Sequence, residues 1–218
     1  MEITPAVLAT DERDCHDKLF HPGLRRVAKR FHIDVLDNTL VPGTCWADPK
    51  IIGSWPNLPE IELHLMVTHP SRHATFWKTK VPTLKNVIIH AESISDPART
   101  CEKMNFMGMS VTIAVNPETQ VETFDNMRSC ADELLIMGVH PGASGQEFLE
   151  EIVLSKIKRA RALFPDLSIA VDGGVNTKSI RAITEAGASR AIAASALWES
   201  HSPEDALEEL GHCAIMNP

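Results

Sequence analysis

Short apolar runs alternate with longer amphipathic or polar stretches along the whole chain, and this alternation limits the fold more than any other feature of the sequence. The runs are rich in β-branched and aliphatic residues, which favours strands. We expect strands at residues 2–8, 31–36, 61–67, 86–90, 110–115, 133–138, 167–172 and 189–194. A repeated strand-then-helix order favours a parallel sheet with helical crossovers.

Two of the intervening segments carry clear helical patterns. Residues 147–163 place apolar side chains at near-helical spacing, with acidic residues at the start and basic residues at the end, the order that the helix dipole favours. Residues 177–186 form the second pattern, with Asn176 as the expected N-cap and Gly187 as the expected C-terminal stop.

Roughly eight strand–helix units in a chain of 218 residues predict a closed (β/α)₈ TIM barrel, an α/β fold in which residues 1–218 form one domain. The pattern leaves an open doubly wound sheet as the alternative. Its dinucleotide-binding version is disfavoured, because no G-x-G-x-x-G motif follows the first strand.

The charge balance argues against nucleic acid as a partner, because Lys and Arg number 21 and Asp and Glu number 29, a formal net charge of −8. A small anionic ligand would have to be held by a few local donors.

The cysteines and the apolar runs indicate the compartment. The five cysteines are odd in number and lack C-x-x-C spacing, which fits reduced thiols. The N-terminus has no signal-like segment, and no apolar run approaches the roughly 18 residues that span a bilayer. We therefore expect a cytoplasmic protein with no membrane partner.

Ionisable side chains lie on several of the apolar strands, where they are costly unless paired or metal-bound. His32 and Asp34 are two residues apart and share one face of the second strand, His64 lies on the third strand, and Asp172 ends the seventh. In a (β/α)₈ barrel the active site lies where the strands end. If the four side chains converge there, they offer two imidazoles and two carboxylates, a donor set that suits one divalent ion such as Zn, Fe, Mn or Co.

Each of these residues also has an ordinary structural interpretation. A lone His in a strand is more often a hydrogen-bonded core residue, and an Asp before Gly-Gly often only forms a turn. Further polar residues stand at strand ends in the same way, namely His90, Glu92, Asn116 and His140. The pattern alone therefore leaves a metal site and core hydrogen bonding as open alternatives.

Three segments rich in small residues follow late strands and precede helices, at 140–148, 171–175 and 193–197. Backbone N–H groups of such loops bind anions at helix N-termini, and the loops after strands seven and eight of a barrel commonly bind phosphate. Such loops are also simply tight turns.

The motifs H-x-D-V-x-D at 32–37, H-x-M-V at 64–67 and V-D-G-G-V at 171–175 occur together in one chain. With them the sequence resembles the ribulose-phosphate 3-epimerase family, (β/α)₈ enzymes of the pentose phosphate pathway. The resemblance covers nearly the whole chain. Its matching stretches are residues 32–42, 62–67, 88–93, 111–119, 137–148 and 171–188.

The resemblance implies that His32, Asp34, His64 and Asp172 are metal ligands and that Asp34 and Asp172 are also the acid/base pair on opposite faces of the substrate. Inverting a carbon next to a ketone requires a proton to leave one face and another to arrive on the other. The metal would polarise the C2 carbonyl and the C3 hydroxyl and stabilise the enediolate.

The resemblance also implies a substrate site. Met66 and Met137 match methionines that line the family's site, and Gly145, Gly174 and Ser195 fall where the family binds phosphate. We include four neighbours in the expected phosphate or substrate contacts, namely Gly142, Ser144, Gly173 and Ala194. The implied partners are one small phosphorylated sugar and further copies of the same chain, since the family forms dimers or hexamers.

Several positions depart from the family pattern. The chain has Ala6 where the family has a substrate-contacting serine, and Ala194 where the family has a glycine. The remaining departures are Leu36 for methionine, Asn38 for glycine, His140 for glutamate and Ala143-Ser144 for Phe-Gly. None removes a metal ligand or an acid/base residue, so the departures concern the substrate more than the chemistry.

The sequence therefore predicts a metal-dependent isomerase that inverts C3 of a ketose phosphate, with D-ribulose 5-phosphate and D-xylulose 5-phosphate as the expected pair. One alternative is an epimerase of another ketose phosphate, such as a ketohexose 6-phosphate, which Ala6 and the altered phosphate loop suggest. Another is a barrel that binds a phosphorylated metabolite without turning it over.

Overall fold

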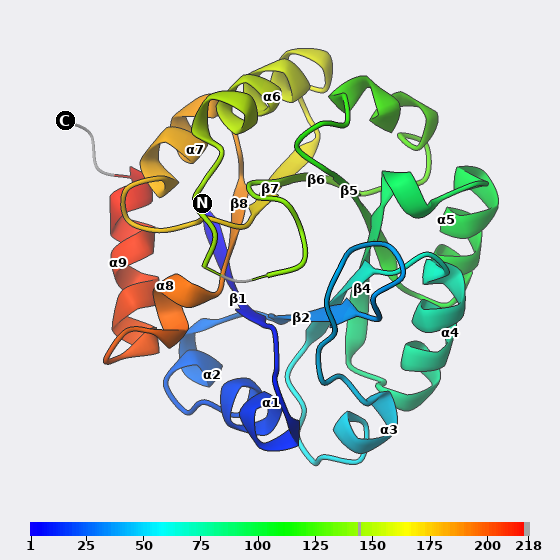
Figure 1. The fold of residues 1–218 in the computed structure, drawn as a ribbon, viewed down its shortest axis with the longest axis vertical. Helices are drawn as coiled ribbons and strands as arrows, with labels where there is room; N and C mark the ends of the chain where they lie inside the picture. Colours follow the sequence, from blue (N-terminus) through cyan, green and yellow to red (C-terminus); the bar gives the residue numbers. More distant parts are fainter. Residues whose placement is uncertain (144, 216–218) are drawn as a thin grey trace.

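Eight parallel strands close into a barrel in the computed structural model, which describes residues 1–143 and 145–215 (Figure 1). The strands are β1 (Glu2–Val7), β2 (Phe31–Leu36), β3 (Ile61–Met66), β4 (Leu84–His90), β5 (Ser110–Val115), β6 (Glu133–Met137), β7 (Ser168–Asp172) and β8 (Arg190–Ala193). β8 pairs with β1, from Glu2 beside Arg190 to Pro5 beside Ala193. The predicted (β/α)₈ barrel is confirmed, and the open sheet is wrong because neither β1 nor β8 is a free edge.

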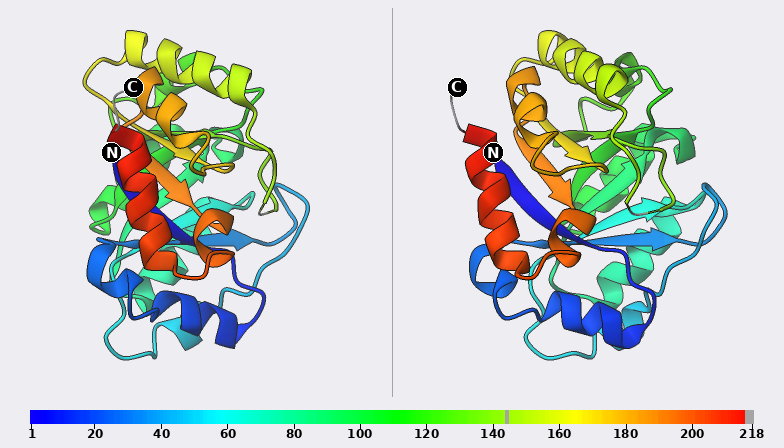
Figure 2. Two further views of the ribbon diagram at one scale, coloured as in Figure 1. Left: turned by 90° about the vertical axis from the view of Figure 1, so that its left-hand side faces the viewer. Right: turned by 60° about the vertical axis from the view of Figure 1, so that its left-hand side comes forward.

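Helices surround the barrel (Figures 1 and 2). They are α1 (Glu12–Leu19), α2 (Leu24–Val27), α3 (Pro49–Ile52), α4 (Pro70–Lys80), α5 (Pro97–Phe106), α6 (Glu150–Leu163), α7 (Ile180–Ala186), α8 (Ser195–Trp198) and α9 (Pro203–Ile215), with 3₁₀ turns η1 (Ala91–Ser93) and η2 (Val121–Asn126). Among the described residues, no helix combines the length and the apolar character needed to cross a membrane.

The predicted strands agree with the observed ones to within two residues at every end, but both predicted helices begin too early. The helix expected at 147–163 begins at Glu150. Phe148 packs so closely on the loop after β7 that a Cβ on Gly174 would lie 2.8 Å from its Cα. The Leu149 N–H donates to the carbonyl of Gly138 at 3.0 Å, so this stretch binds the strand ends instead of starting a helix.

The helix expected at 177–186 begins at Ile180, because residues 177–179 form a separate turn. Asn176 does act as a cap, but of that turn, since its Oδ1 accepts the N–H groups of Lys178 and Ser179 at 2.9 and 3.2 Å. Gly187 ends the helix at φ 112°, a backbone conformation that glycine adopts without strain, as predicted.

The core between the strands and the helices is apolar, whereas the interior of the barrel is partly polar. Every residue of β2 and β3 is buried, because each strand has helices on one side and the barrel interior on the other. The interior holds small and aliphatic side chains together with buried polar ones, which include Thr4, His32, Glu62, Asn86 and Arg190. Such interiors are usually filled by branched apolar residues, so these polar groups require an explanation.

Gly138 follows β6 and donates its N–H to the carbonyl of Asp172 at the end of β7, and it offers a test of the packing between these strand ends. A Cβ at Gly138 would lie 2.1 Å from the carbonyl oxygen of Gly173. We expect Gly138→Ala to lower the free energy of unfolding by about 1–3 kcal/mol, because backbone would have to move. The matched variant is Gly211→Ala in α9, where an added Cβ would meet no described atom outside the neighbouring helix backbone within 4 Å, and it should raise the free energy of unfolding by about 0.5–1 kcal/mol. Urea unfolding followed by circular dichroism measures both, and equal stability of the two variants would contradict this account.

Candidate active site

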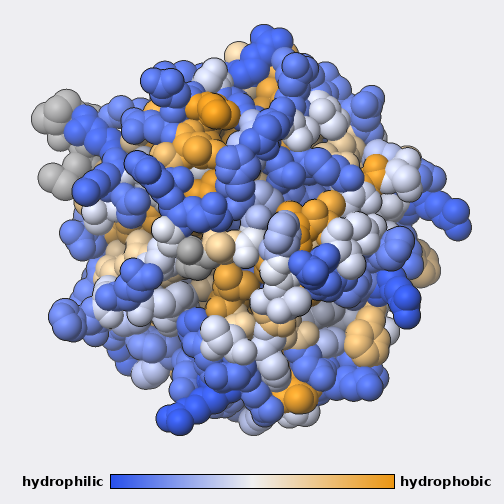
Figure 3. Space-filling model, viewed as in Figure 1, coloured by the Kyte–Doolittle hydropathy of each residue, from blue (hydrophilic) through white to orange (hydrophobic). Residues whose placement is uncertain are grey.

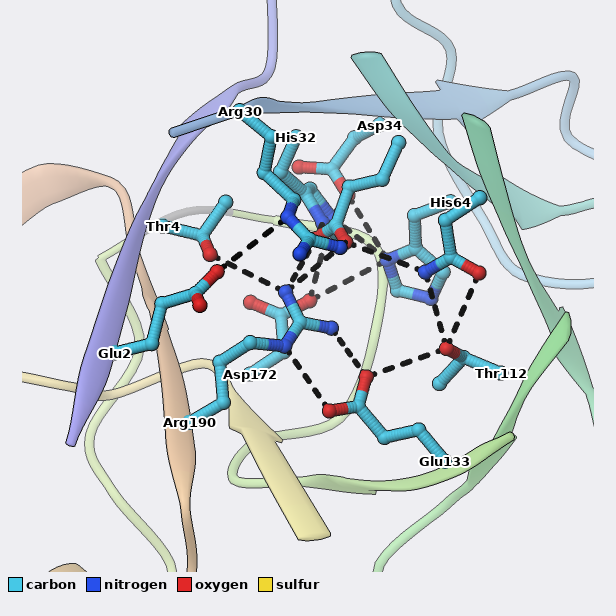
Figure 4. Close-up of polar contacts among 12 residues, drawn as sticks. Glu2, Thr4, Arg30, His32, Asp34, His64, Thr112, Glu133, Asp172 and Arg190 are labelled. Atoms are coloured by element: carbon cyan, nitrogen blue, oxygen red, sulfur yellow. Dashed lines mark hydrogen bonds and ion pairs between the residues drawn. The ribbon is translucent and has the colours of Figure 1, made fainter. Parts of the chain in front are cut away.

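Four ionisable side chains from three strands meet inside the barrel (Figure 4). His32 and Asp34 come from β2, His64 from β3 and Asp172 from the last position of β7. One donor atom from each lies within 4.8 Å of the others. The convergence that the sequence predicted is therefore present, and the four residues could hold one metal ion.

The register of the strands creates this meeting point. His32 and Asp34 share one face of β2, and Asp34 lies directly beside His64 of β3 in the parallel pairing. Asp172 lies on β7, which is linked to β2 through the pairing of β7 with β8, of β8 with β1 and of β1 with β2. Closure of the barrel thus brings together residues that are far apart in the sequence.

The donor atoms are spaced as ligands of a single ion would be. Asp34 Oδ1 lies 3.0 Å from both His32 Nε2 and His64 Nδ1, and these two nitrogens are 3.3 Å apart. Asp172 Oδ2 lies 3.3 Å from His64 Nδ1 and 3.8 Å from His32 Nε2. Donors bound about 2.0–2.2 Å from one ion are about 3.0–3.5 Å apart at bond angles near about 90–110° and farther apart at wider angles. The site residues therefore fit a metal ion, although mixed nitrogen and oxygen donors do not select which one.

The electrostatics of the cluster favour positive charge at its centre. Burial opposes the charged form of His32, but the carboxylates of Asp34, Glu62 and Asp172 outweigh it and raise the pKa of His32 to about 10. Burial is likewise outweighed at His64, whose pKa is raised by hydrogen bonds to Asp172 and Asp34. Burial would raise the pKa of Asp34, yet the neighbouring imidazoles hold that pKa well below its usual range. A bound cation would pair with the carboxylates of Asp34 and Asp172.

Each imidazole also has a partner on its second ring nitrogen, the one that faces away from Asp34. His32 Nδ1 lies 2.8 Å from Glu62 Oε1, and His64 Nε2 lies 2.9 Å from His90 Nε2. Histidines that bind metals are usually oriented by such a partner on the other ring nitrogen. His90, which the sequence singled out only as a strand-end residue, therefore contacts the cluster through His64.

Sequence reasoning missed the polar residues below the cluster, that is, inside the barrel near the first residues of the strands. Glu62, Glu133 and Arg190 are buried and joined by ion pairs, with Arg190 contacting both carboxylates. A signal was present, because Glu62 precedes His64 by two residues and so faces the same side of β3. Glu133 and Arg190 each begin an apolar strand and carried no comparable local signal.

A cavity opens above the cluster and contains the residues expected to contact substrate. Asp34 and Asp172 form its floor, and no lysine or arginine is among the described residues that line it. The expected residues found in its lining are Met66, Met137, Gly142, Gly145, Gly173, Gly174, Ala194 and Ser195. Ser144 was also expected there, but it lies outside the described residues. Hydrophobic residues gather near the middle of the face viewed down the barrel, within a largely hydrophilic surround (Figure 3).

Two departures from the family pattern have local explanations. Asn38, in place of glycine, adopts φ 62°, which Asn tolerates, and its Oδ1 accepts the N–H of Gly43 at 3.0 Å. Ala6 is buried, and its carbonyl accepts a hydrogen bond from the indole N–H of Trp198. The first departure keeps the loop geometry, whereas the second leaves no side-chain hydroxyl at position 6 for a substrate.

The model of the ribulose-phosphate 3-epimerase family matches residues 2–198. The chain belongs to this family. Ribulose-phosphate 3-epimerases from Bacillus subtilis (strain 168) and Helicobacter pylori (strain J99) are similar to it, at 32% identity over 187 residues and 31% over 216 residues. The first alignment covers 82% of this chain and 84% of the relative, and the second covers 96% of each. As a member of the ribulose-phosphate 3-epimerase family, the chain is an enzyme, an isomerase that acts on carbohydrates.

Solved structures share the fold at lower sequence identity. The 3-hexulose-6-phosphate synthase of Salmonella typhimurium superposes with a TM-score of 0.69 at 13% identity, covering 99% of both chains. A mutant tryptophan synthase α-subunit of Pyrococcus furiosus also gives a TM-score of 0.69, at 12% identity, covering 98% of this chain and 97% of the other. At such low identity these similarities support only the barrel fold of this epimerase-family chain.

Proposed function

We propose that this protein is a metal-dependent epimerase that inverts C3 of a ketose phosphate and interconverts D-ribulose 5-phosphate and D-xylulose 5-phosphate. One observation carries the proposal: the carboxylates of Asp34 and Asp172, from β2 and β7, both open into the cavity and both belong to the four-residue cluster. The name of the family supports a ribulose phosphate as the substrate and C3 as the carbon that is inverted.

Epimerisation next to a ketone needs two proton-transfer groups. Asp34 and Asp172 approach the cavity from different strands, so a planar intermediate held between them would present one face to each carboxylate. One carboxylate removes the C3 proton, and the other, in its acid form, donates a proton to the opposite face. The roles reverse in the back reaction.

His32, Asp34, His64 and Asp172 would hold one divalent ion, with Zn, Fe, Mn and Co as the candidates. When bound, the ion would supply a positive charge that polarises the substrate carbonyl and stabilises the enediolate. Glu62 and His90 keep the two imidazole rings turned toward the cluster.

The remaining cavity residues bind and cover the substrate in this proposal. Met66 and Met137 provide an adaptable apolar cover over the intermediate. The phosphate would be held by backbone N–H groups of three loops, which contribute Gly142, Ser144, Gly145, Gly173, Gly174, Ala194 and Ser195. We further propose that the protein works in the cytoplasm as a homo-oligomer, in line with its family resemblance.

The proposal is tested by incubating the purified, metal-loaded protein with D-ribulose 5-phosphate in D₂O. We expect formation of D-xylulose 5-phosphate with deuterium at C3, because the proton that arrives comes from a carboxyl group that exchanges with solvent. Absence of both would overturn the assignment. A ketohexose 6-phosphate assayed in parallel supplies the comparison: a higher kcat/KM on that sugar would favour the alternative epimerase.

The two-base scheme predicts that Asp34→Asn and Asp172→Asn each lower the epimerisation rate by at least about 10²–10⁴-fold, because an amide cannot accept the C3 proton. One of the variants should still exchange the C3 proton of one epimer with solvent, through the base that remains. The control is Asp125→Asn at an exposed position, which should keep the rate of the unaltered protein. Near-normal turnover in either active-site variant would contradict the scheme, provided that metal content is measured for each.

The metal site predicts that a chelator abolishes activity and that one equivalent of a divalent ion restores it. His64→Gln should weaken binding of that ion by more than about 100-fold, since it removes a donor and not just its support. His212→Gln, on the exposed face of α9, is the matched control and should not change the affinity. Chelator competition measures both, and equal affinities would exclude His64 from the site.

A further inference from the structure

Arg190 lies inside the barrel directly below the four-residue cluster, and the proposed reaction does not use it (Figure 4). Its side chain is 6% exposed, and the side chain of its partner Glu62 is 0% exposed. Removing a guanidinium and a carboxylate from water costs so much that apolar replacements are often at least as stable. Stability alone therefore does not account for an arginine at this position.

The guanidinium of Arg190 is divided between two carboxylates. Nη1 donates to both oxygens of Glu62, at 2.8 and 3.0 Å, and also lies 3.2 Å from Thr4 Oγ1. On the other side, Nε and Nη2 donate to Glu133, the first at 3.1 Å. Glu133 in turn accepts hydrogen bonds from Ser168 and Thr112 and does not reach the cluster. The Glu62 arm leads directly to the cluster, whereas the Glu133 arm reaches Glu62 only through Thr112 and Asn86, whose Nδ2 lies 3.0 Å from Thr112 Oγ1 and 3.3 Å from Glu62 Oε2.

Glu62 determines which nitrogen of His32 faces the cluster. A carboxylate only accepts hydrogen bonds, so at 2.8 Å from Glu62 Oε1 the Nδ1 atom of His32 must carry the proton. Because Glu62 keeps the proton on Nδ1, a cation that binds His32 displaces the proton of Nε2, the atom that lies 3.0 Å from Asp34 and 3.3 Å from His64. This is the tautomer in which His32 can bind a cation together with Asp34 and His64.

A second arginine competes for Glu62. Arg30 Nη1 lies 3.8 Å from Glu62 Oε2, and the side chain of Arg30 is 27% exposed. Glu62 could turn toward Arg30 and away from His32 if nothing held it in place. Asn86 donates one hydrogen bond to Glu62 Oε2 at 3.3 Å, and the two bonds from Arg190 oppose that movement more strongly, because they are charge-assisted and engage both oxygens at once.

We propose that Arg190 is a positioning residue for the metal site: it anchors Glu62, and through Glu62 it sets the ring orientation and the tautomer of His32. This inference rests on the proposed function, since it takes His32 to be a metal ligand. Arg190 touches neither the cluster nor the cavity, so it acts only through Glu62.

The test uses protein stripped of metal and titrated with Co²⁺, whose visible absorption reports the ligand set, with affinity measured by chelator competition. Arg190→Met alone would leave two buried carboxylates without the cation that they share, so it is combined with Glu133→Gln, and Glu133→Gln alone is the control. We expect the control to bind Co²⁺ within about twofold of the unaltered protein and the double variant to bind about 10–100-fold more weakly. Replacing Met by Lys at position 190 in the same background should recover part of the loss, because a cation beside Glu62 is restored.

Equal Co²⁺ affinity in the double variant and the control would overturn the proposal, as would a Lys variant that binds no better than the Met variant. A protein with unaltered sequence that binds no Co²⁺ would overturn the metal site itself and this inference with it. A second measurement needs no variant: ¹⁵N NMR of the Zn²⁺-loaded protein should show His32 protonated on Nδ1. The opposite tautomer would overturn the role of Glu62 and Arg190 even if the metal site stands.

Discussion

The pairing of β8 with β1 is the interaction on which the rest of the structure depends. It closes the sheet, and by doing so it places the side chains of β7 and β8 opposite those of β2 and β3. Asp172 reaches Asp34 and His64 only across this closed interior. Arg190 reaches Glu62 in the same way, from a strand whose first residue pairs with Glu2. An open sheet of the same strands would leave these charges apart.

Closure also creates a physical problem, because it buries charged groups that would otherwise be solvated. Two layers of buried polar side chains inside the barrel pair these charges with each other. In the lower layer, one guanidinium is shared by Glu62 and Glu133. In the upper layer, two imidazoles lie between Asp34 and Asp172, and positive charge is favoured at their centre. His32 belongs to both layers, since its two ring nitrogens contact Glu62 and Asp34. The support of the site and the site itself are therefore one continuous network.

Much of the fold and of the cluster was predictable, because both depend on short-range patterns. Apolar runs of strand length located all eight strands, and the two-residue spacing of His32 and Asp34 placed both on one face. The start of α6 was not predictable in this way. Residues 147–149 have helical spacing, but packing of Phe148 on the loop after β7 outweighs that local preference. Arg190 and Glu133 were missed because a single charged residue at the start of a strand usually faces solvent.

The order of strands and helices, the pattern of buried faces and the chemical types of the candidate ligands follow from short stretches of sequence, because these properties depend on neighbouring residues. Which charges share a partner depends on the folded barrel. In the folded barrel, Asp172 lies beside Nδ1 of His64, and His90 contacts Nε2 of the same ring. Arg190 pairs with both Glu62 and Glu133. The physical reason is that strand register and barrel closure are properties of the whole sheet, and the cost of a buried charge depends on groups supplied by distant parts of the chain.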